Sequence, residues 1–394
     1  MTWNIQRLRA ETPGCTGQIY LDNAGSALMP DPVIKKMSDH LSAEAKMGGY
    51  RAAEAASAEI EAVYAALAGL FGAKPAEVAV LASATEAWDR AFYSLDFAPG
   101  DRIVTAWNEY CANYLAYLHM QRRKGVEVVV IGANRAGDLD LAALEAAIDD
   151  KTRLISLSHV PSSSGQVIPA VEVGRLARAA GVPFLLDACQ SVGQMPVDVD
   201  EIGCDMLTGT ARKFLRGPRG MGVLYVREAM LDRLDPAFLT NQGAVWTGPD
   251  AYELTPGARR LEAWERNVAA QLGLGAAVDY TMALGLSAIR ERSWGLAARL
   301  RAGLEDLPAV TVRDQGSVLS AIVTFTVAGL AAAEVKERLA ARDVHVQVAQ
   351  AHHTLLDMQP RGLESAVRAS PHYYNTEDEI DRALEIIASA TSAA

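Results

Sequence analysis

The sequence predicts an α/β protein built on a mostly parallel sheet that helices cover on both faces. Between about residues 55 and 230, short runs rich in β-branched residues alternate with segments of helical spacing. Runs such as "VEVVVIG" and "VPFLLDA" are largely apolar and lack a polar face. Short apolar strands separated by helices are typical of a parallel sheet that is buried on both sides. Ligands of such sheets bind at the carboxyl ends of the strands.

Seven segments are expected to form strands of this sheet: "EVAVLAS" (77–83), "RIVTAW" (102–107), "VEVVVIG" (126–132), "TRLISLS" (152–158), "VPFLLDA" (182–188), "DMLTGT" (205–210) and "GVLYVR" (222–227). A helix is expected before the first strand, over residues 52–71, and helices are expected between later strands, over residues 140–149 and 171–180. A further helix is expected to begin after Ser83.

The pattern changes after Val226. Residues 238–256 form a polar stretch with Gly, Pro, Asn and Thr, and helical spacing follows over residues 259–284 and 287–307. Two strand-like runs, "SAIVTFTV" and "VHVQVA", flank a helical segment over residues 331–342, and a last helix begins at Glu377. We therefore expect a smaller α+β domain at residues 251–394, a large domain at 21–250, and an N-terminal arm at 1–20 that packs with the small domain.

Composition narrows the class of protein. The 394 residues carry a formal charge of −11, which disfavours nucleic acid or an anionic membrane as the main partner. The N-terminal residues have no apolar run typical of a signal peptide, so a cytoplasmic location is expected. The four cysteines are widely spaced without a CxxC pair, so neither a disulfide framework nor a metal site is predicted.

Polar side chains follow several predicted strands. Ser83, Ala84, Thr85 and Glu86 come directly after one strand, where helix N–H groups suit a phosphate, although a simple N-cap has the same pattern. Tyr110 follows another strand, where an aromatic ring stacks on a flat ligand or serves packing. His159 and the serines Ser162–Ser164 follow a third strand, in a pattern that is also typical of a turn.

The strongest signal joins two strand ends. Asp187 closes a wholly apolar strand, where a carboxylate is costly unless it meets a cation or a strong donor. Lys213 follows a later strand in "GTARKFLRGPRGMG", together with Thr210 and Arg212. A ring nitrogen for Asp187, an aldehyde carbon for Lys213 and a phosphate for Thr210 and Arg212 together describe pyridoxal phosphate.

With "TARKFLRGPRGMGVLYV", "FLLDACQSVGQMPVDV" and "ASATEAW", the chain resembles the class V aminotransferase group of fold-type I pyridoxal phosphate enzymes. This group includes cysteine desulfurases, isopenicillin N epimerase-like proteins and the C–S lyases of ergothioneine biosynthesis. The resemblance runs from about Leu21 to "VRASPHYYNTEDEID" near the C-terminus. It implies a seven-stranded, mostly parallel sheet, a smaller C-terminal domain and a homodimer with the active site at the subunit boundary.

The resemblance also implies roles for individual residues. Lys213 is then the Schiff-base lysine and moves the Cα proton, and Asp187 pairs with the pyridinium. Tyr110 takes the place of the ring-stacking histidine of the desulfurases. The remaining expected contacts are Gln190 and Ser162 or Ser163 at the ring hydroxyl, Thr85 with the backbone of Ala84 and Glu86, Thr210 and Arg212 at the phosphate, and Arg368 at the substrate carboxylate.

The reaction stays open between three outcomes. No cysteine follows Cys204, so the desulfurase route lacks the nucleophile that it needs on a loop of the late domain. We therefore favour β-elimination from a cysteine-derived amino acid, with transamination and epimerisation as alternatives. Epimerisation would need a second acid, for which Tyr110 or the pair His352–His353 are candidates. The stretch "NQGAVWTGPDAYEL" is the candidate for the segment that reaches the phosphate of a second subunit.

Overall fold

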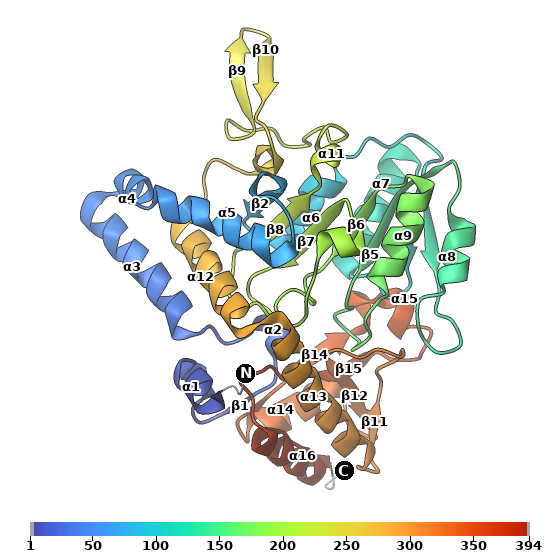
Figure 1. The fold of residues 1–394 in the computed structure, drawn as a ribbon. Coiled ribbons are helices and arrows are strands. Elements are labelled where there is room, and N and C mark those ends of the chain that lie inside the picture. The colour runs from blue at the N-terminus through green and yellow to red at the C-terminus, as the bar shows by residue number, and fades with distance from the viewer. Residues whose placement is uncertain (1–3, 392–394) are drawn as a thin grey trace.

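The computed structural model describes residues 4–391 and has two sheets that divide the chain into a large and a small domain (Figure 1). The large sheet has the order β2-β8-β7-β6-β5-β3-β4. In that order its strands are Val78–Leu81, Gly222–Val226, Met206–Thr210, Phe184–Asp187, Thr152–Ser158, Arg102–Ala106 and Glu127–Ile131. Only β8 runs against its neighbours β2 and β7, so the expected mostly parallel seven-stranded sheet is confirmed.

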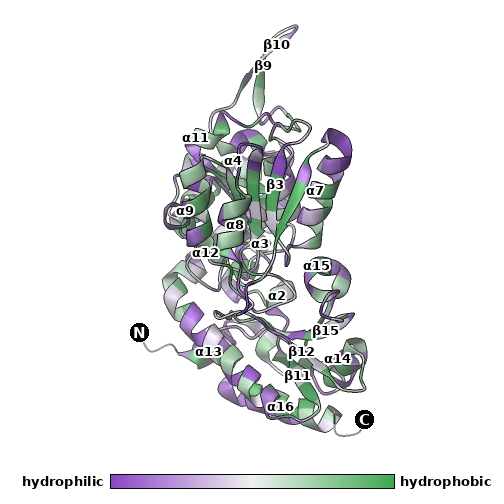
Figure 2. Ribbon diagram, turned by 90° about the vertical axis from the view of Figure 1, so that its right-hand side faces the viewer, coloured by the Kyte–Doolittle hydropathy of each residue, from purple (hydrophilic) through white to green (hydrophobic). Residues whose placement is uncertain are grey.

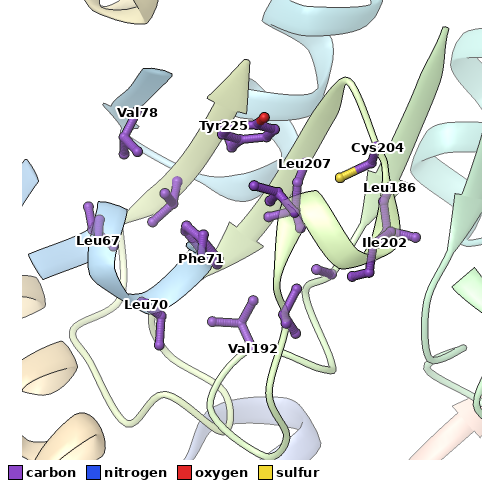
Figure 3. Close-up of a cluster of buried hydrophobic side chains, with 14 of the residues drawn as sticks. Leu67, Leu70, Phe71, Val78, Leu186, Val192, Ile202, Cys204, Leu207 and Tyr225 are labelled. Carbon is purple, nitrogen blue, oxygen red and sulfur yellow. The ribbon is translucent and has the colours of Figure 1, made fainter. Parts of the chain in front are cut away.

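Helices cover both faces of this sheet, as predicted. The helices of the large domain are α3 (Asp31–Met47), α4 (Gly49–Ala55), α5 (Ser57–Phe71), α6 (Ala84–Phe92), α7 (Cys111–Lys124), α8 (Leu141–Ala147), α9 (Ala170–Ala180), α10 (Val199–Ile202), α11 (Glu228–Leu231) and α12 (Val268–Leu284). Apolar residues of α5, α8, α9 and α12 bury one face, and those of α6 and α7 bury the other. Figure 3 shows part of the first layer, where Phe71 and Val192 pack near Leu207.

The small domain lies beyond the carboxyl ends of the large sheet's parallel strands. Its sheet has the order β11-β12-β15-β14, with strands Val310–Val312, Val323–Val327, Ser365–Ala369 and Gln347–Gln350, all antiparallel. Its helices are α13 (Leu286–Glu305), α14 (Ala332–Ala340), α15 (Leu355–Met358) and α16 (Glu377–Thr391). In Figure 2 the strands are largely green, while outer turns of α13 and α16 are purple, as amphipathic covering helices require.

The N-terminal segment packs against the small domain. Helix α1 (Ile5–Ala10) shares an apolar cluster with Ile289 and Tyr373, and β1 (Ile19–Tyr20) pairs in parallel with β13 (Val344–His345). Helix α2 (Asn23–Ser26) follows, and the preceding Asp22 bridges to Ser370. The chain then crosses to the large domain at α3.

The structure differs from the expected boundary between residues 250 and 251. That position lies within a hairpin of β9 (Ala244–Gly248) and β10 (Ala251–Leu254), in the polar stretch of residues 238–256. Helix α12 then packs on α3 and α5, so the small domain begins at α13. The helix expected over residues 259–284 starts only at Val268, because the side chain of Asn267 caps it by accepting from the amide of Ala270.

Within residues 4–391, no single helix is both long and apolar enough to cross a bilayer. Helices α12 and α13 pass such a test only as a pair, and the two axes bend by 82° where they meet.

Candidate active site

One cavity collects polar side chains from five strand ends of the large sheet. These ends belong to β2, β3, β5, β6 and β7, whose carboxyl ends point to the same edge. The lining residues are Ser83, Ala84, Thr85, Tyr110, Ser158, Val160, Ser162, Asp187, Cys189, Gln190, Thr210, Arg212 and Lys213. The sequence prediction placed most of these residues at a common site, and the structure brings them together.

Lys213 lies in the tight loop that follows β7. Gly193 has φ +90°, and a Cβ there would lie 2.3 Å from the amide nitrogen of Leu215, so the loop packs directly on this glycine. Burial, with smaller contributions from Arg212 and Arg368, lowers the pKa of Lys213. A lowered pKa favours the neutral amine, which is the form that attacks an aldehyde.

Asp187 closes β6 and faces the same cavity. Its side chain is only 8% exposed and accepts from the amide nitrogen of Asn113 and the backbone N–H of Cys189, each at 2.9 Å. Among the described residues it forms no ion pair. A buried carboxylate without a cationic partner is costly, and a positively charged group bound in the cavity would stabilise it.

The opposite end of the cavity has the character of an anion site. Ser83, Ala84 and Thr85 stand at the N-terminus of α6, near Thr210 and Arg212. A Cβ on Gly222 would lie 2.2 Å from the carbonyl of Ser83, so only glycine lets β8 start this close to the loop. The guanidinium of Arg212 donates to the carbonyl of Gly25.

Glu86 differs from the expectation that its backbone holds the phosphate. Its amide N–H donates to Ser83 Oγ at 3.0 Å, within the N-cap of α6. Its carboxylate accepts from Ala82 N–H at 3.2 Å and pairs with Arg90 at 3.0 Å. Glu86 therefore caps the helix, and it does not line the cavity.

Two buried oxygens near the cavity have no partner in the protein. Gln190 donates its amide to the carbonyl of Ala24 at 3.1 Å, but its Oε1 is buried and unpaired. Ser162 lines the cavity, whereas Ser163 is buried with an unpaired Oγ. Unpaired buried polar atoms are rare and point to a missing ligand group, such as a ring hydroxyl.

Tyr110 is the N-cap residue of α7, and its ring lines the cavity. Burial is the largest cause that raises the pKa of Tyr110, and the thiol of Cys111 and the charge of Asp187 raise it further. The phenol therefore stays neutral near pH 7. The ring is thus suited to stacking on a flat ligand and unsuited to proton abstraction near neutral pH.

Arg368 reaches toward the cavity from β15 of the small domain. Its guanidinium contacts Asp22 at 3.3 Å and donates to the carbonyl of Ser162 at 3.0 Å, while its buried Nε has no partner. Its contact with Ser162, which lines the cavity, places it beside the cavity wall. The spare N–H can bind a substrate carboxylate.

Sequence reasoning missed two residues behind Asp187. Glu109 lies just before the N-cap of α7 and Asn113 in its first turn, and Asn113 contacts both Glu109 and Asp187. The glutamate in "WNEYCAN" could have been noticed as a charge entering a buried strand end. The contact between Asn113 and Asp187 on β6 is a tertiary contact that no pattern in the sequence indicates.

These residues fit pyridoxal phosphate. A carboxylate without an ion pair suits the pyridine nitrogen, the unpaired Gln190 Oε1 suits the ring hydroxyl, the α6 N-terminus suits the phosphate, and a buried lysine suits the aldehyde. The fold and the cavity therefore define an α/β enzyme that depends on this cofactor.

The family model described as "Aminotransferase class-V" matches residues 19–383, and the chain belongs to that family. A cysteine desulfurase of Dickeya dadantii (strain 3937) is 32% identical over 403 residues, covering 96% of this chain and 94% of that protein. An apo structure of cysteine desulfurase from Thermococcus onnurineus NA1 superposes with a TM-score of 0.90 at 27% identity, over 100% and 99% of the chains. A cystine C–S lyase bound to its product cysteine persulfide superposes with a TM-score of 0.87 at 23% identity, over 96% and 99%.

Proposed function

We propose that this protein is a C–S lyase that cleaves a cysteine-derived amino acid by β-elimination, without passing sulfur to a cysteine of its own. Relatives that cleave a C–S bond, named above as cysteine desulfurases, support the substrate class. The observation that carries the proposal is the placement of the thiols.

No cysteine follows Cys204, so the small domain, which faces the cavity with Arg368, contributes no thiol. Among the residues that line the cavity within 4–391, Cys189 is the single cysteine. The backbone N–H of Cys189 donates to Asp187. Cys189 therefore lies beside that carboxylate, and not on the side of the cavity that the small domain faces. Burial beside Asp187 raises the pKa of Cys189, so its thiol stays protonated and is a poor acceptor of sulfur.

Pyridoxal phosphate, when bound, withdraws electrons from the Cα of an amino acid that is joined to its aldehyde carbon. Lys213 would serve as the base at Cα, and burial favours its neutral form. Asp187 would pair with the ring nitrogen and hold the proton there. Arg368 binds the α-carboxylate with its free N–H.

The elimination conserves atoms and electrons without a nucleophilic side chain of the protein. Lys213 accepts the Cα proton, the Cα–H electrons form the Cα–Cβ double bond, and the C–S electrons leave with sulfur as a thiolate. The unsaturated amine then takes up water and releases ammonia and pyruvate. The protein supplies orientation and proton transfer, which is sufficient because sulfur is a good leaving group.

We also propose a homodimer in which the β9–β10 hairpin reaches the cavity of the second subunit. The hairpin projects from the large domain in Figures 1 and 2. Val245, Trp246 and Tyr252 on it are 62%, 80% and 57% exposed. Such apolar exposure on a projecting hairpin suits a protein interface.

Products separate the possible reactions. The purified holoenzyme is incubated singly with S-alkyl cysteines, cysteine sulfoxides, cystine and alanine, and Lys213→Ala serves as the control. We expect pyruvate and ammonia in equal amounts with sulfur substrates. Stoichiometric pyridoxamine phosphate would instead indicate transamination, and racemised substrate would indicate epimerisation. Protein-bound persulfide that disappears in Cys189→Ala would contradict the proposed route for sulfur.

A further inference from the structure

Glu109 is a buried carboxyl that no cation balances. It follows β3, is 3% exposed, and forms no ion pair among the described residues. Its Oε1 accepts three hydrogen bonds: from Tyr110 N–H at 2.7 Å, from Asn113 Nδ2 at 3.1 Å and from Ser158 Oγ at 2.5 Å. An ionised carboxylate at this depth is costly unless it is paired.

The second oxygen of Glu109 faces hydroxyl groups only. Oε2 lies 3.3 Å from Thr105 Oγ1 and 3.4 Å from Tyr117 Oη. Tyr117 gives its proton to Ser156 Oγ at the shorter distance of 2.7 Å, which leaves a lone pair of Tyr117 toward Glu109. A proton on Oε2 therefore has an acceptor in place.

One amide joins Glu109 to the carboxylate that serves the cofactor. Asn113 Nδ2 lies 3.1 Å from Glu109 Oε1 and 2.9 Å from Asp187 Oδ2, so its two hydrogens go to two carboxyl groups. Two carboxyl groups that share one donor in a buried site do not both ionise easily. Asp187 faces the cavity and its cationic ligand, whereas Glu109 faces the interior.

We propose that Glu109 is a positioning residue, which holds a proton in its buried site and, through Asn113, orients Asp187 as the carboxylate of the cofactor site. The pattern is that of two acids whose surroundings push their protonation apart. This inference rests on the cofactor site and is independent of whether elimination or transamination follows.

The groups around Glu109 agree with this division. Strands β3 and β5 contribute only hydroxyls, β6 contributes Asp187, and α7 contributes the amide of Asn113 and the neutral phenol of Tyr117, while Tyr110 contributes its backbone N–H. Burial raises the pKa of Glu109 to about 7, and the charge of Asp187 adds to this effect. Lys213 lines the same cavity as Asp187, and the charge of Asp187 acts on it.

The test compares wild type with Glu109→Gln, which keeps the shape and cannot ionise. Glu262→Gln is the matched control, because Glu262 is also buried, accepts from Tyr64 and Val80, and lies away from the cavity. Infrared spectra of the apoproteins at pH 6 report protonated carboxyl groups directly. The visible absorbance of the bound cofactor from pH 6 to 10 reports the coupling to Asp187.

We expect a protonated-carboxyl band in the wild type and in Glu262→Gln that Glu109→Gln lacks. We also expect the cofactor spectra of Glu109→Gln and wild type to coincide at pH 6. At higher pH Glu109 of the wild type becomes negatively charged, and this charge stabilises the cationic form of the bound cofactor. Glu109→Gln lacks the charge, so it should lose the cationic form at a pH that is lower by on the order of one unit. Glu262→Gln should follow the wild type throughout.

Two results would overturn the proposal. One is a wild-type infrared spectrum at pH 6 without a band that Glu109→Gln removes, because Glu109 would then be ionised. The other is cofactor spectra that superpose at every pH, or that Glu262→Gln shifts equally, because Glu109 would then have no specific coupling to Asp187. Failure of the wild type to bind pyridoxal phosphate would instead overturn the cofactor site itself.

Discussion

The floor and the roof of the cavity are built on different principles. The floor, formed by Lys213, Asp187, Gln190 and the residues 83–85, comes from strand ends of the large sheet and leaves Gln190 Oε1 without a protein partner. The roof, formed by Arg368 and Asp22, is an ion pair of 3.3 Å between the small domain and the N-terminal segment. The floor is completed by a cofactor, whereas the roof is already held by its ion pair and keeps one N–H, on Arg368 Nε, for a substrate carboxylate.

The largest expected effect belongs to the floor. Lys213→Ala removes both the covalent anchor and the base, and we expect turnover to fall by at least about a thousandfold. Pyridoxal phosphate should still bind through the residues at the phosphate end. Product assays and cofactor absorbance check both points, and near-normal turnover would show that another residue is the base.

Asp187 tests the charge requirement of the floor. Asp187→Ala should lower kcat by on the order of a hundred- to a thousandfold, because the ring nitrogen loses its partner. Asp187→Glu should lose far less, since it keeps the charge. Steady-state kinetics of the two variants give the comparison, and equal activity would contradict the pairing.

The buried carboxyl group of Glu109 should make the stability of the apoprotein depend on pH. Its pKa is about 7 in the folded state, above its ordinary value, so the folded protein holds a proton that the unfolded chain has released. Stability from this group is complete at low pH and is lost as pH rises to about 7, by up to roughly 3 kcal/mol. Urea unfolding of wild type and Glu109→Gln from pH 4.5 to 8 measures it.

The histidines contribute equally to the stability of both proteins, so their contribution cancels when the free energy of unfolding of Glu109→Gln is subtracted from that of the wild type. His159 and His372 are buried, and their pKa values fall to about 4 and about 3, so they act in the opposite direction in both proteins. A stability difference that stays constant with pH would show that Glu109 does not change protonation on folding.

The roof should affect binding more than chemistry. Arg368→Ala loses charged hydrogen bonds to the substrate, so we expect KM to rise by roughly ten- to a hundredfold with a smaller fall in kcat. Arg368→Lys should recover part of this loss, because it keeps the charge without the planar fork. A loss confined to kcat would move Arg368 into the chemical step.

The smallest effect is expected at Tyr110. Tyr110→Phe keeps the ring and removes only a phenol that stays neutral, so turnover should change less than about twofold. Tyr110→Ala should weaken cofactor binding by about 1 kcal/mol through lost stacking. A large loss in Tyr110→Phe would assign the hydroxyl a proton-transfer role and would favour epimerisation.

Much of the floor could be predicted from the sequence, because it depends on local patterns. All seven strands of the large sheet coincide with the predicted apolar runs, and the polar side chains of the site lie at or shortly after the carboxyl ends of five of them. Asp187 and Lys213 stand out since charge directly after a buried strand needs a partner. The β9–β10 hairpin was missed because its exposed strands lack an apolar face that a core would impose.

The roof and the support of the floor could not be found in this way. Arg368 was identified only through resemblance, because its contact with Asp22 joins residues 346 positions apart. The bridge from Glu109 through Asn113 to Asp187 depends on how α7 packs beside β6. Such contacts arise from the assembled fold rather than from any one segment.

The most direct measurement of the central claim is the position at which the cofactor bonds to the chain. The holoenzyme is treated with borohydride, digested, and mapped by mass spectrometry for the reduced cofactor. The cavity predicts a single modified residue, Lys213, and no modification in Lys213→Ala. Modification of a different lysine, or an unmodified chain that still turns over substrate, would contradict the account.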